Sequence, residues 1–581
     1  MKKITFLTIA CLFTCSVFVS AIDILDVEPG VGTLNDAINQ YKGERIYRLK
    51  NGYNGYYVLN EIINNTGFEL TIIGGGTPDG NDPKPTMPPT VQTSGTGGIP
   101  FTHMFHVFEN ITLQGIYFMN ATADGVYNSQ FFMRIDGNDI RVNIDNCILD
   151  PAGNPIYSPG GSPKIYLTNN LFNRLTYQTL SVNGPVNFYF PNDLSGIDTL
   201  FIENNTFIGL STAIFQSSTL VKIGFVWINH NTFIHHINQI DWMYNKESYY
   251  FTNNLFYDCH VVPFNKGWGG GGGYPPDNIC ELIRSYPSPT VRDNGVEVEF
   301  GFDKMTNFVA NNIEFKNKQF LDNLDDLDTW TNEVGTDNGF IFQPLVWTPD
   351  APARGLELSE ALENSELASI YNSEEHLNWK AVGNKYDIDP MFTDPRIKEH
   401  SDILAQWVLP AVKNDYFPGF YSSIDHTSLN WYWDPDGNVG ENETWPLFDG
   451  SYTNELALNF GLDGLPVGDL NWFPEAKEIW LDHKQEIDEH ILSLNTEKMD
   501  ITANESIGYR SHAIIYPNPA KESFRITGNV DDLITIFDIT GKIVKSVKYQ
   551  GSVSISDVSR GIYFVKFESE GKPVVCKLII K

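Results

Sequence analysis

Four aromatic residues, Tyr166, Phe201, Trp227 and Tyr250, occupy the same place in four successive copies of a short repeated pattern. The pattern is apolar-x-apolar-x-Asn-x-x-Phe, and its alternation of apolar residues is typical of a half-buried β-strand. The second position of such a strand points away from the core, so the four rings would form one column on the outside of a sheet. Aromatic faces stack on sugar rings, and the column is therefore a candidate polysaccharide track.

The fourth position of the pattern supplies a polar column beside the aromatic one, and this column contains the carboxylates Asp145 and Glu203. The two residues lie two coils apart, which corresponds to roughly 10 Å at the spacing of adjacent strands. Inverting glycoside hydrolysis would tolerate that distance only marginally. β-Elimination on a uronic acid needs an Arg or Lys base, and the outward columns contain neither. These residues predict sugar binding and leave catalysis open.

The same aromatic column has a second interpretation. Contiguous apolar patches on a protein surface are usually either covered or functional. The acidic segment 321–500, or a long loop, could fold over the rings and bury them. Both interpretations remain open at the level of sequence.

Two further groups of residues could carry chemistry, but their spacing favours structural roles. His230 replaces the recurring Asn of the pattern, and His235 and His236 are adjacent, so they cannot both face one way on a strand. With Asp241 they do not predict a metal site. The stretch Asp434–Asn438 resembles the start of a calcium loop but lacks the closing Glu at the twelfth position. We expect no metal and no cofactor, with calcium as the weak exception.

The copies of the pattern indicate the fold. Successive copies start 23 to 35 residues apart, apart from one longer gap, which is the length of one coil of a β-solenoid with loops of varying length. The recurring Asn suits a turn where the backbone bends and the side chain bonds to the next coil. The copies lie at 111–118, 142–149, 165–172, 200–207, 226–233 and 249–256, with a looser one at 308–315.

The N-terminal part fits a cap and first coils. The stretch 32–39 predicts a short amphipathic helix, and strands are expected at 46–49, 52–58 and 70–75. These stretches, together with Asp389–Pro395, resemble the pectin-lyase-like superfamily of right-handed parallel β-helices over roughly 30–400. The resemblance implies the fold. That fold hosts lyases, hydrolases, esterases and adhesins, and the catalytic arginine and calcium-binding aspartates of the lyases cannot be placed in this chain.

The C-terminal region contains short alternating strands separated by turns, which predicts a small antiparallel β-sandwich. The stretches Tyr516–Ala520, Phe537–Lys542, Ser559–Val565 and Lys577–Lys581 resemble the type A sorting domain of the type IX secretion system. The resemblance implies export across the outer membrane, with the secretion machinery as a partner. It implies nothing about activity.

Composition supports an exported globular protein. Residues 1–21 resemble a secretory signal peptide, with Lys2 and Lys3 before an apolar run and small residues at the end. No later apolar run is long enough to span a bilayer. The net charge of −33 makes nucleic acid a poor partner. Cys259 and Cys280 flank a glycine-rich run, and whether they form a disulfide is left open.

We therefore expect an all-β chain with five parts: a signal peptide (1–21), a parallel β-helix with a helical cap (22–400), an irregular acidic extension with a helix (401–493), a linker (494–512) and a sorting β-sandwich (513–581). The expected function of this monomer, secreted or held at the outer cell surface, is to bind or degrade extracellular polysaccharide. If it is an enzyme, a lyase or glycoside hydrolase is expected. The alternative is a non-catalytic surface adhesin or structural β-helix protein.

Overall fold

The computed structural model describes the chain from Asp23 to Asn495 and from Ile515 to Ile580, with internal gaps. The longest gaps are 123–130, 176–187, 266–286, 356–368, 416–432 and 434–444. The chain forms two compact units, one ending at Asn495 and the other beginning at Thr496. Each unit is described by itself.

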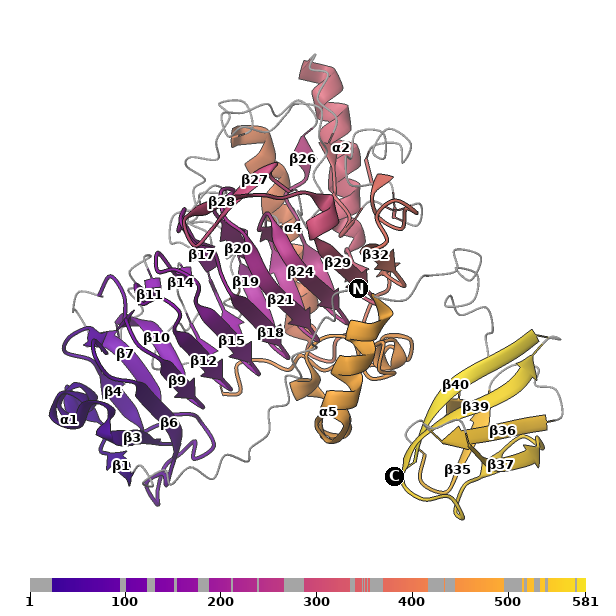
Figure 1. Ribbon diagram of the computed structural model, residues 1–581, viewed down its shortest axis with the longest axis horizontal. Helices are drawn as coiled ribbons and strands as arrows, with labels where there is room; N and C mark the ends of the chain where they lie inside the picture. The colour runs from indigo at the N-terminus through magenta and orange to yellow at the C-terminus, as the bar shows by residue number, and fades with distance from the viewer. Residues whose placement is uncertain are drawn as a thin grey trace. The chain divides into compact units, whose positions relative to one another are not determined.

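The larger unit is a right-handed parallel β-helix built from three parallel sheets (Figure 1). Every coil contributes one strand to sheet A and one to sheet B, and seven successive coils also contribute one to sheet C, so that neighbours within a sheet are one coil apart in the chain. Sheet A comprises β1 (Asp23–Val27), β3 (Arg45–Lys50), β6 (Leu70–Gly76), β9 (Ile111–Gln114), β12 (Arg141–Asp145), β15 (Lys164–Thr168), β18 (Thr199–Glu203), β21 (Ile223–Asn229), β24 (Lys246–Thr252), β29 (Thr306–Ala310) and β32 (Trp379–Val382).

Sheet B follows sheet A in every coil and has the same number of strands. It comprises β2 (Gly30–Val31), β4 (Tyr56–Val58), β7 (Thr90–Ser94), β10 (Tyr117–Thr122), β13 (Ile148–Leu149), β16 (Leu171–Asn173), β19 (Thr206–Leu210), β22 (Thr232–His236), β25 (Leu255–Cys259), β30 (Ile313–Phe315) and β33 (Lys385–Tyr386). Sheet C is shorter and comprises β5 (Ile63–Asn64), β8 (Phe105–Val107), β11 (Phe131–Ile135), β14 (Asn154–Tyr157), β17 (Phe188–Phe190), β20 (Phe215–Ser217) and β23 (Asp241–Trp242).

The last position of the repeated pattern fills the core between the sheets. Phe172, Phe207, Phe233 and Phe256 stack one above another, with ring centroids 4.6 to 4.8 Å apart. All four rings are fully buried. The stacking matches the spacing of adjacent strands and explains why the pattern ends on the same residue in successive coils.

The fifth and sixth positions of the pattern have different roles in the bend between sheets A and B. The fifth-position residues adopt left-handed backbone conformations, with φ from 51° to 66°, at Gly115, Asn146, Asn169, Asn204, His230, Asn253 and Asn311. The ladder that the sequence analysis placed at the fifth position is formed by the sixth. There, each buried Asn donates to the side-chain oxygen of the next at 2.9 to 3.0 Å, through Asn170, Asn205, Asn231, Asn254, Asn312 and Asn384.

The looser seventh copy is shifted by one residue from its expected alignment. The copy at 308–315 would place its second residue, Val309, in the outward aromatic column, but Phe308 pairs with Tyr250 and stands there instead. Ala310 then takes the fourth position and Asn311 the fifth. The sequence fits either alignment because Asn311 and Asn312 are consecutive, and a one-residue slip exchanges the two faces of a strand.

Helices lie outside the coils (Figure 1). Helix α1 (Thr33–Tyr41) packs at the N-terminal end of the β-helix and buries its own Leu34 and Ile38 there. Helix α2 (Lys318–Val334) packs against α4 (Pro395–Asp415). Helix α5 (Pro474–Leu494) buries Trp480, Ile487 and Ile491. Among the described residues, none of the helices is both long and apolar enough to cross a membrane.

The acidic extension runs back along the bend between sheets A and B, towards earlier coils. Asn311 donates to the carbonyl oxygen of Phe460 at 2.8 Å, and Asn253 accepts from the Leu462 amide at 2.8 Å. Further along, Asn471 donates to the carbonyl oxygen of Asn204 and Lys477 donates to Asn169, at 2.9 and 2.5 Å. The left-handed residues of the bend are therefore the points at which the extension is held.

The smaller unit is a two-sheet β-structure. Three antiparallel strands, β34 (Ile515–Tyr516), β35 (Ser523–Ile526) and β38 (Val553–Ser554), form one sheet. The other contains β37 (Ile543–Lys548), β36 (Leu533–Asp538), β39 (Gly561–Ser569) and β40 (Lys572–Ile580) in that order. The core of this unit is separate from that of the β-helix and contains Phe524, Ile534, Ile536, Val565 and Leu578.

Candidate functional site

The aromatic column of sheet A is continuous, but it is not an open track. Tyr166 and Phe201 are half-buried, whereas Trp227 and Tyr250 are only 1% and 7% exposed. The cover comes from α5 and its end: Lys484 lies 5.4 Å from the centre of the Phe201 ring. The expected four-coil sugar track is thus closed in its C-terminal half, because the acidic extension folds over the rings.

The two carboxylates of the polar column also differ from an exposed acid–base pair. Glu203 is 1% exposed and accepts hydrogen bonds from Trp227 Nε1 at 2.9 Å and Asn229 at 3.0 Å. Burial alone would raise its pKa, but the Lys484 ammonium, 2.8 Å away, and these hydrogen bonds outweigh burial and lower the pKa. Asp145 is half-buried and accepts from Gln114, Thr168 and Asn169 at 2.7 to 2.9 Å.

Two lysines that the sequence columns do not contain reach sheet A from α5. Lys484 bridges Glu203 and Asp488, at 2.8 Å from each. Burial lowers the pKa of Lys477 to about 8. Both lysines hold α5 against the β-helix, Lys484 through Glu203 and Lys477 through Asn169. The covered half of sheet A is therefore a surface on which α5 packs.

The histidine and aspartate cluster noted in the sequence is divided among separate contacts. His230 Nε2 lies 2.8 Å from Asp463, and His235 Nε2 lies 2.8 Å from the Ser401 hydroxyl. Asp241 pairs with Lys246 at 2.6 Å. Asp434–Asn438 and Cys280 lie outside the described residues, whereas Cys259 is a buried free thiol.

The structure shows a second outward row of polar and aromatic side chains, on sheet C. Strand register places one residue per coil in this row, from seven successive coils. The alternate residues of the same strands, such as Phe105, Met133 and Phe188, are fully buried. The row consists of Asn64, His106, Arg134, Tyr157, Tyr189, Gln216 and Trp242.

Charged residues at the N-terminal end of this row hold one another in place. Arg134 donates to the Asp136 carboxylate through Nε at 2.6 Å and through a terminal nitrogen at 3.1 Å. His106 Nε2 contacts the same carboxylate. Burial would raise the pKa of Asp136, but the hydrogen bonds from Arg134 and His106 outweigh it and lower the pKa. Burial and the nearby His106 lower the pKa of His103 to about 4, so His103 is neutral at pH 7.

Aromatic rings continue the row. Tyr157 stacks on Phe131 with ring centroids 4.5 Å apart, and the Arg134 guanidinium lies 5.5 Å from its ring centre. Tyr189 follows in the next coil, 5.9 Å from Tyr157. From His106 to Trp242 the residues of this row are half-buried, so their side chains combine fixed positions with access to solvent.

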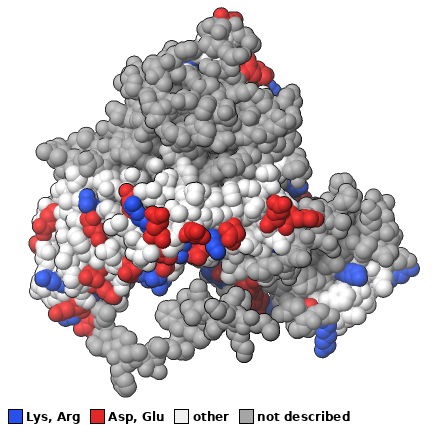
Figure 2. Space-filling view, turned by 45° about the horizontal axis from the view of Figure 1, so that its top comes forward, with Lys and Arg blue, Asp and Glu red and all other residues white. Residues whose placement is uncertain are grey.

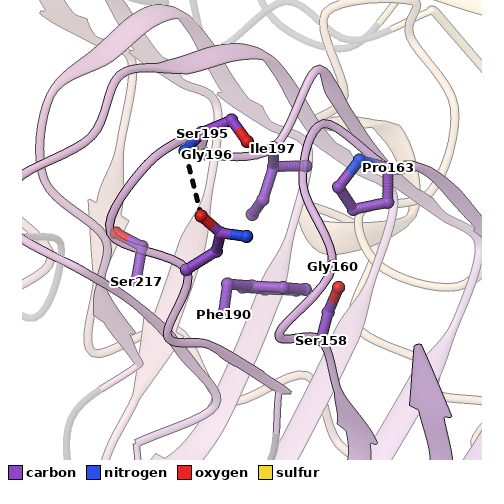
Figure 3. Close-up of a pocket in the computed structure, with 9 residues that line it drawn as sticks. Ser158, Gly160, Pro163, Phe190, Ser195, Gly196, Ile197 and Ser217 are labelled. Carbon is purple, nitrogen blue, oxygen red and sulfur yellow. Dashed lines mark hydrogen bonds between the residues drawn. The ribbon is translucent and has the colours of Figure 1, made fainter. Parts of the chain in front are cut away.

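The turns beside sheet C contain two small pockets. One, between Ser158, Phe190, Asn192 and Ser217, is shown in Figure 3 and leaves no space for a water-sized molecule. The other has a cavity volume of about 270 Å³, and the side chains that line it are polar apart from Leu194 and two glycines. In Figure 2 acidic and basic side chains are interspersed over the described surface. The row on sheet C, with one residue from each of seven coils, is more extensive than either pocket and is the candidate site.

The sequence contains a signal that could have revealed this row. Each row residue belongs to a short stretch in which apolar and other residues alternate, and each stretch precedes a copy of the repeated pattern. The distance from the row residue to the start of the next copy is 5 to 11 residues for His106, Arg134, Tyr157, Tyr189, Gln216 and Trp242. These stretches vary in type and distance, because the turns from sheet C to sheet A differ in length. Their common face became evident only when register aligned them.

These features define a parallel β-helix joined to a small two-sheet module, and comparison with known proteins identifies the role of that module. Residues 514–581 match the family described as the secretion system C-terminal sorting domain. The module is the type IX sorting domain expected from the sequence, and the chain is a cargo that is secreted or placed on the cell surface.

No curated protein matches the chain. Among solved structures, the chain is similar to a PL6 family alginate lyase, AlyGC, at 16% identity over 41% of this chain and 35% of that chain, with a TM-score of 0.23. A single-residue variant of AlyGC is similar at 13% identity over 51% of this chain and 36% of that chain, with a TM-score of 0.27. The chain spans about a third of the length of these solved structures.

Proposed function

We propose that this exported protein binds an extracellular polysaccharide along the outward row of sheet C. The observation that carries the proposal is the row itself, in which Tyr157, Tyr189 and Trp242 share one face with Arg134 and His106. A row of seven strands spans about 29 Å at the spacing of adjacent strands, which is long enough for several sugar residues.

The chemistry of the row suits a sugar chain. Sugars present apolar ring faces to aromatic side chains and hydroxyl groups to hydrogen-bonding ones, and the row contains both kinds of group. Tyr157 and Tyr189 provide ring faces, whereas Arg134, Gln216 and Asn64 provide donors and acceptors. Export places the row where polysaccharides of the surroundings can reach it.

Degradation of the bound chain is the further possibility within this function, and a non-catalytic adhesin is the second candidate. One observation favours binding alone: the Asp136 carboxylate, which touches two residues of the row, already accepts hydrogen bonds from Arg134 and His106. A carboxylate held in this way orients its partners and is poorly placed to exchange protons with a substrate.

The test is a panel of neutral and uronate polysaccharides titrated into the purified chain and into the variant Tyr157→Ala. Loss of one stacked ring removes roughly 1–1.5 kcal/mol, so the variant should bind the recognised glycan about tenfold more weakly. Tyr166→Ala is the matched control, since Tyr166 is an equally half-buried outward tyrosine on sheet A. Its affinity should equal that of the parent.

The same panel separates the two candidates. New reducing ends or unsaturated sugar products would show degradation, whereas saturable binding without products would show an adhesin. Binding lost in Tyr166→Ala and kept in Tyr157→Ala would move the site to sheet A and overturn the proposal. Absence of binding to every polysaccharide in the panel would overturn it as well.

A further inference from the structure

The sorting module has an unusual surface on its four-stranded sheet. Strand register aligns Ile543, Phe537 and Phe564 across three neighbouring strands. Ile543 is 58% exposed and Phe564 40% exposed, and Phe537 is half-buried between them. The residues that alternate with them, such as Ile536 and Val565, fill the core, so the aligned residues form one outward row.

Lysines flank this apolar row. Lys566 pairs with Thr535 in the next row of the same face, and Lys548 pairs with Leu533, which is 62% exposed. We call these residues together the outer face: Leu533, Thr535, Phe537, Ile543, Ser546, Lys548, Phe564 and Lys566. Four of the fourteen large apolar side chains exposed in the described chain, counting Val544 beside this face, fall within this short module.

Exposed apolar surface with a polar rim marks an interaction site in a soluble protein. The charge of the module indicates what kind of partner fits. Residues 514–581 contain 10 basic and 7 acidic residues, whereas the remainder of the chain contains 29 basic and 65 acidic residues. A partner surface edged with carboxylates would therefore repel the rest of the cargo and attract this end of it.

We propose that the outer face is the surface by which the export machinery recognises this cargo, and that its partner is an apolar surface edged with carboxylates. The family match assigns sorting to residues 514–581 as a whole, and the inference assigns the recognition to one of the two sheets. The apolar row provides the contact area, and the lysines provide orientation and selection against the acidic part of the chain.

The test is export of the full chain in a bacterium that has a type IX secretion system, with the double variant Lys548→Glu/Lys566→Glu. Reversal of both charges should lower the amount reaching the surface or medium at least tenfold, with accumulation in the periplasm. The matched control is Lys521→Glu/Arg525→Glu, which reverses two charges at exposed positions by the three-stranded sheet. The control should be exported to within twofold of the parent.

Thermal unfolding of the purified variants separates recognition from folding. If the Glu substitutions lower the melting temperature of the module, Lys548→Gln/Lys566→Gln removes the charges without reversal and is measured in the same way. Export at the parental level with both substitutions of the outer face would overturn the proposal, and so would equal loss in the control. Unchanged export with altered hydrogen exchange in residues 23–495 would show that the outer face docks on its own chain instead.

Discussion

Asparagine provides most of the bends between sheets A and B and the internal hydrogen-bonded ladder of the β-helix. At the fifth position of the pattern the side chain accompanies a left-handed backbone, a conformation that asparagine tolerates better than most residues. At the sixth position the buried amide has both a donor and an acceptor, so each Asn can join the coil before it to the coil after it.

Asn231 illustrates the second role. Its Nδ2 donates to the Ile202 carbonyl and to Asn254 Oδ1, at 3.0 Å each, and its Oδ1 accepts from Asn205. Because all of these groups are buried, removal of one member leaves several without partners.

We therefore expect Asn231→Ala to lower the free energy of unfolding by about 3–5 kcal/mol, more than loss of one hydrogen bond would. The measurement is denaturant unfolding of the purified chain. Asn143→Ala, at a half-buried outward position of sheet A, is the control and should cost less than about 1 kcal/mol. Equal effects of the two substitutions would contradict the role of the ladder.

At the scale of elements, α4 is held on the coils by a buried polar network. The Ser401 hydroxyl lies 2.8 Å from His235 Nε2 and donates to Asp258 at 2.6 Å. Asp258 also accepts from the Asn317 amide at 2.6 Å, next to the start of α2. This network places α2 and α4 against sheet B, and its side chains His235, Asp258 and Ser401 are buried, which indicates a structural role.

The network makes stability depend on pH. Burial raises the pKa of Asp258 to about 6, so the folded state retains a proton that the unfolded state loses near pH 4. The contribution of Asp258 to the free energy of unfolding is fully present below about pH 4. It declines by about 3 kcal/mol in all as the pH rises towards and through 6.

The variant Asp258→Asn cannot titrate, and asparagine suits the left-handed backbone at this position, where φ is 49°. Between pH 4 and pH 6.5 the melting temperature of the parent should therefore fall relative to that of the variant. Asp303→Asn, at a side chain that is 74% exposed, should follow the parent at every pH. Parallel curves for parent and Asp258→Asn would show that this carboxyl does not titrate with folding.

At the scale of the whole molecule, the chain joins two units with separate hydrophobic cores. The core of the β-helix contains residues of the three parallel sheets, and that of the sorting module contains residues of its two antiparallel sheets. Each core is complete within its own unit, so each should fold without the other.

A chain ending at Asn495 should consequently unfold within about 2 °C of the corresponding transition in the full chain. Differential scanning calorimetry of both proteins provides the measurement, and binding of the recognised glycan should be the same for both. A decrease of more than about 5 °C would show that the sorting module stabilises the β-helix.

Much of the fold was predictable because its determinants are local. Alternating apolar residues, a recurring Asn and a terminal Phe specify a strand, a bend and a stacked core residue within eight positions, and the pattern recurs in seven successive coils. The sorting module was recognisable for a similar reason, since its motifs lie within about 70 consecutive residues.

The candidate site depended on contacts that sequence spacing does not encode. Whether Trp227 is open or covered is decided by α5, whose Lys484 is 281 residues from its partner Glu203. The outward row on sheet C likewise brings together residues from coils whose loops differ in length. Local patterns determined the coil and the export signal of this protein, because neighbouring residues fix backbone conformation. Tertiary structure decided which outward face is free, because a face is opened or closed by segments far away in the chain.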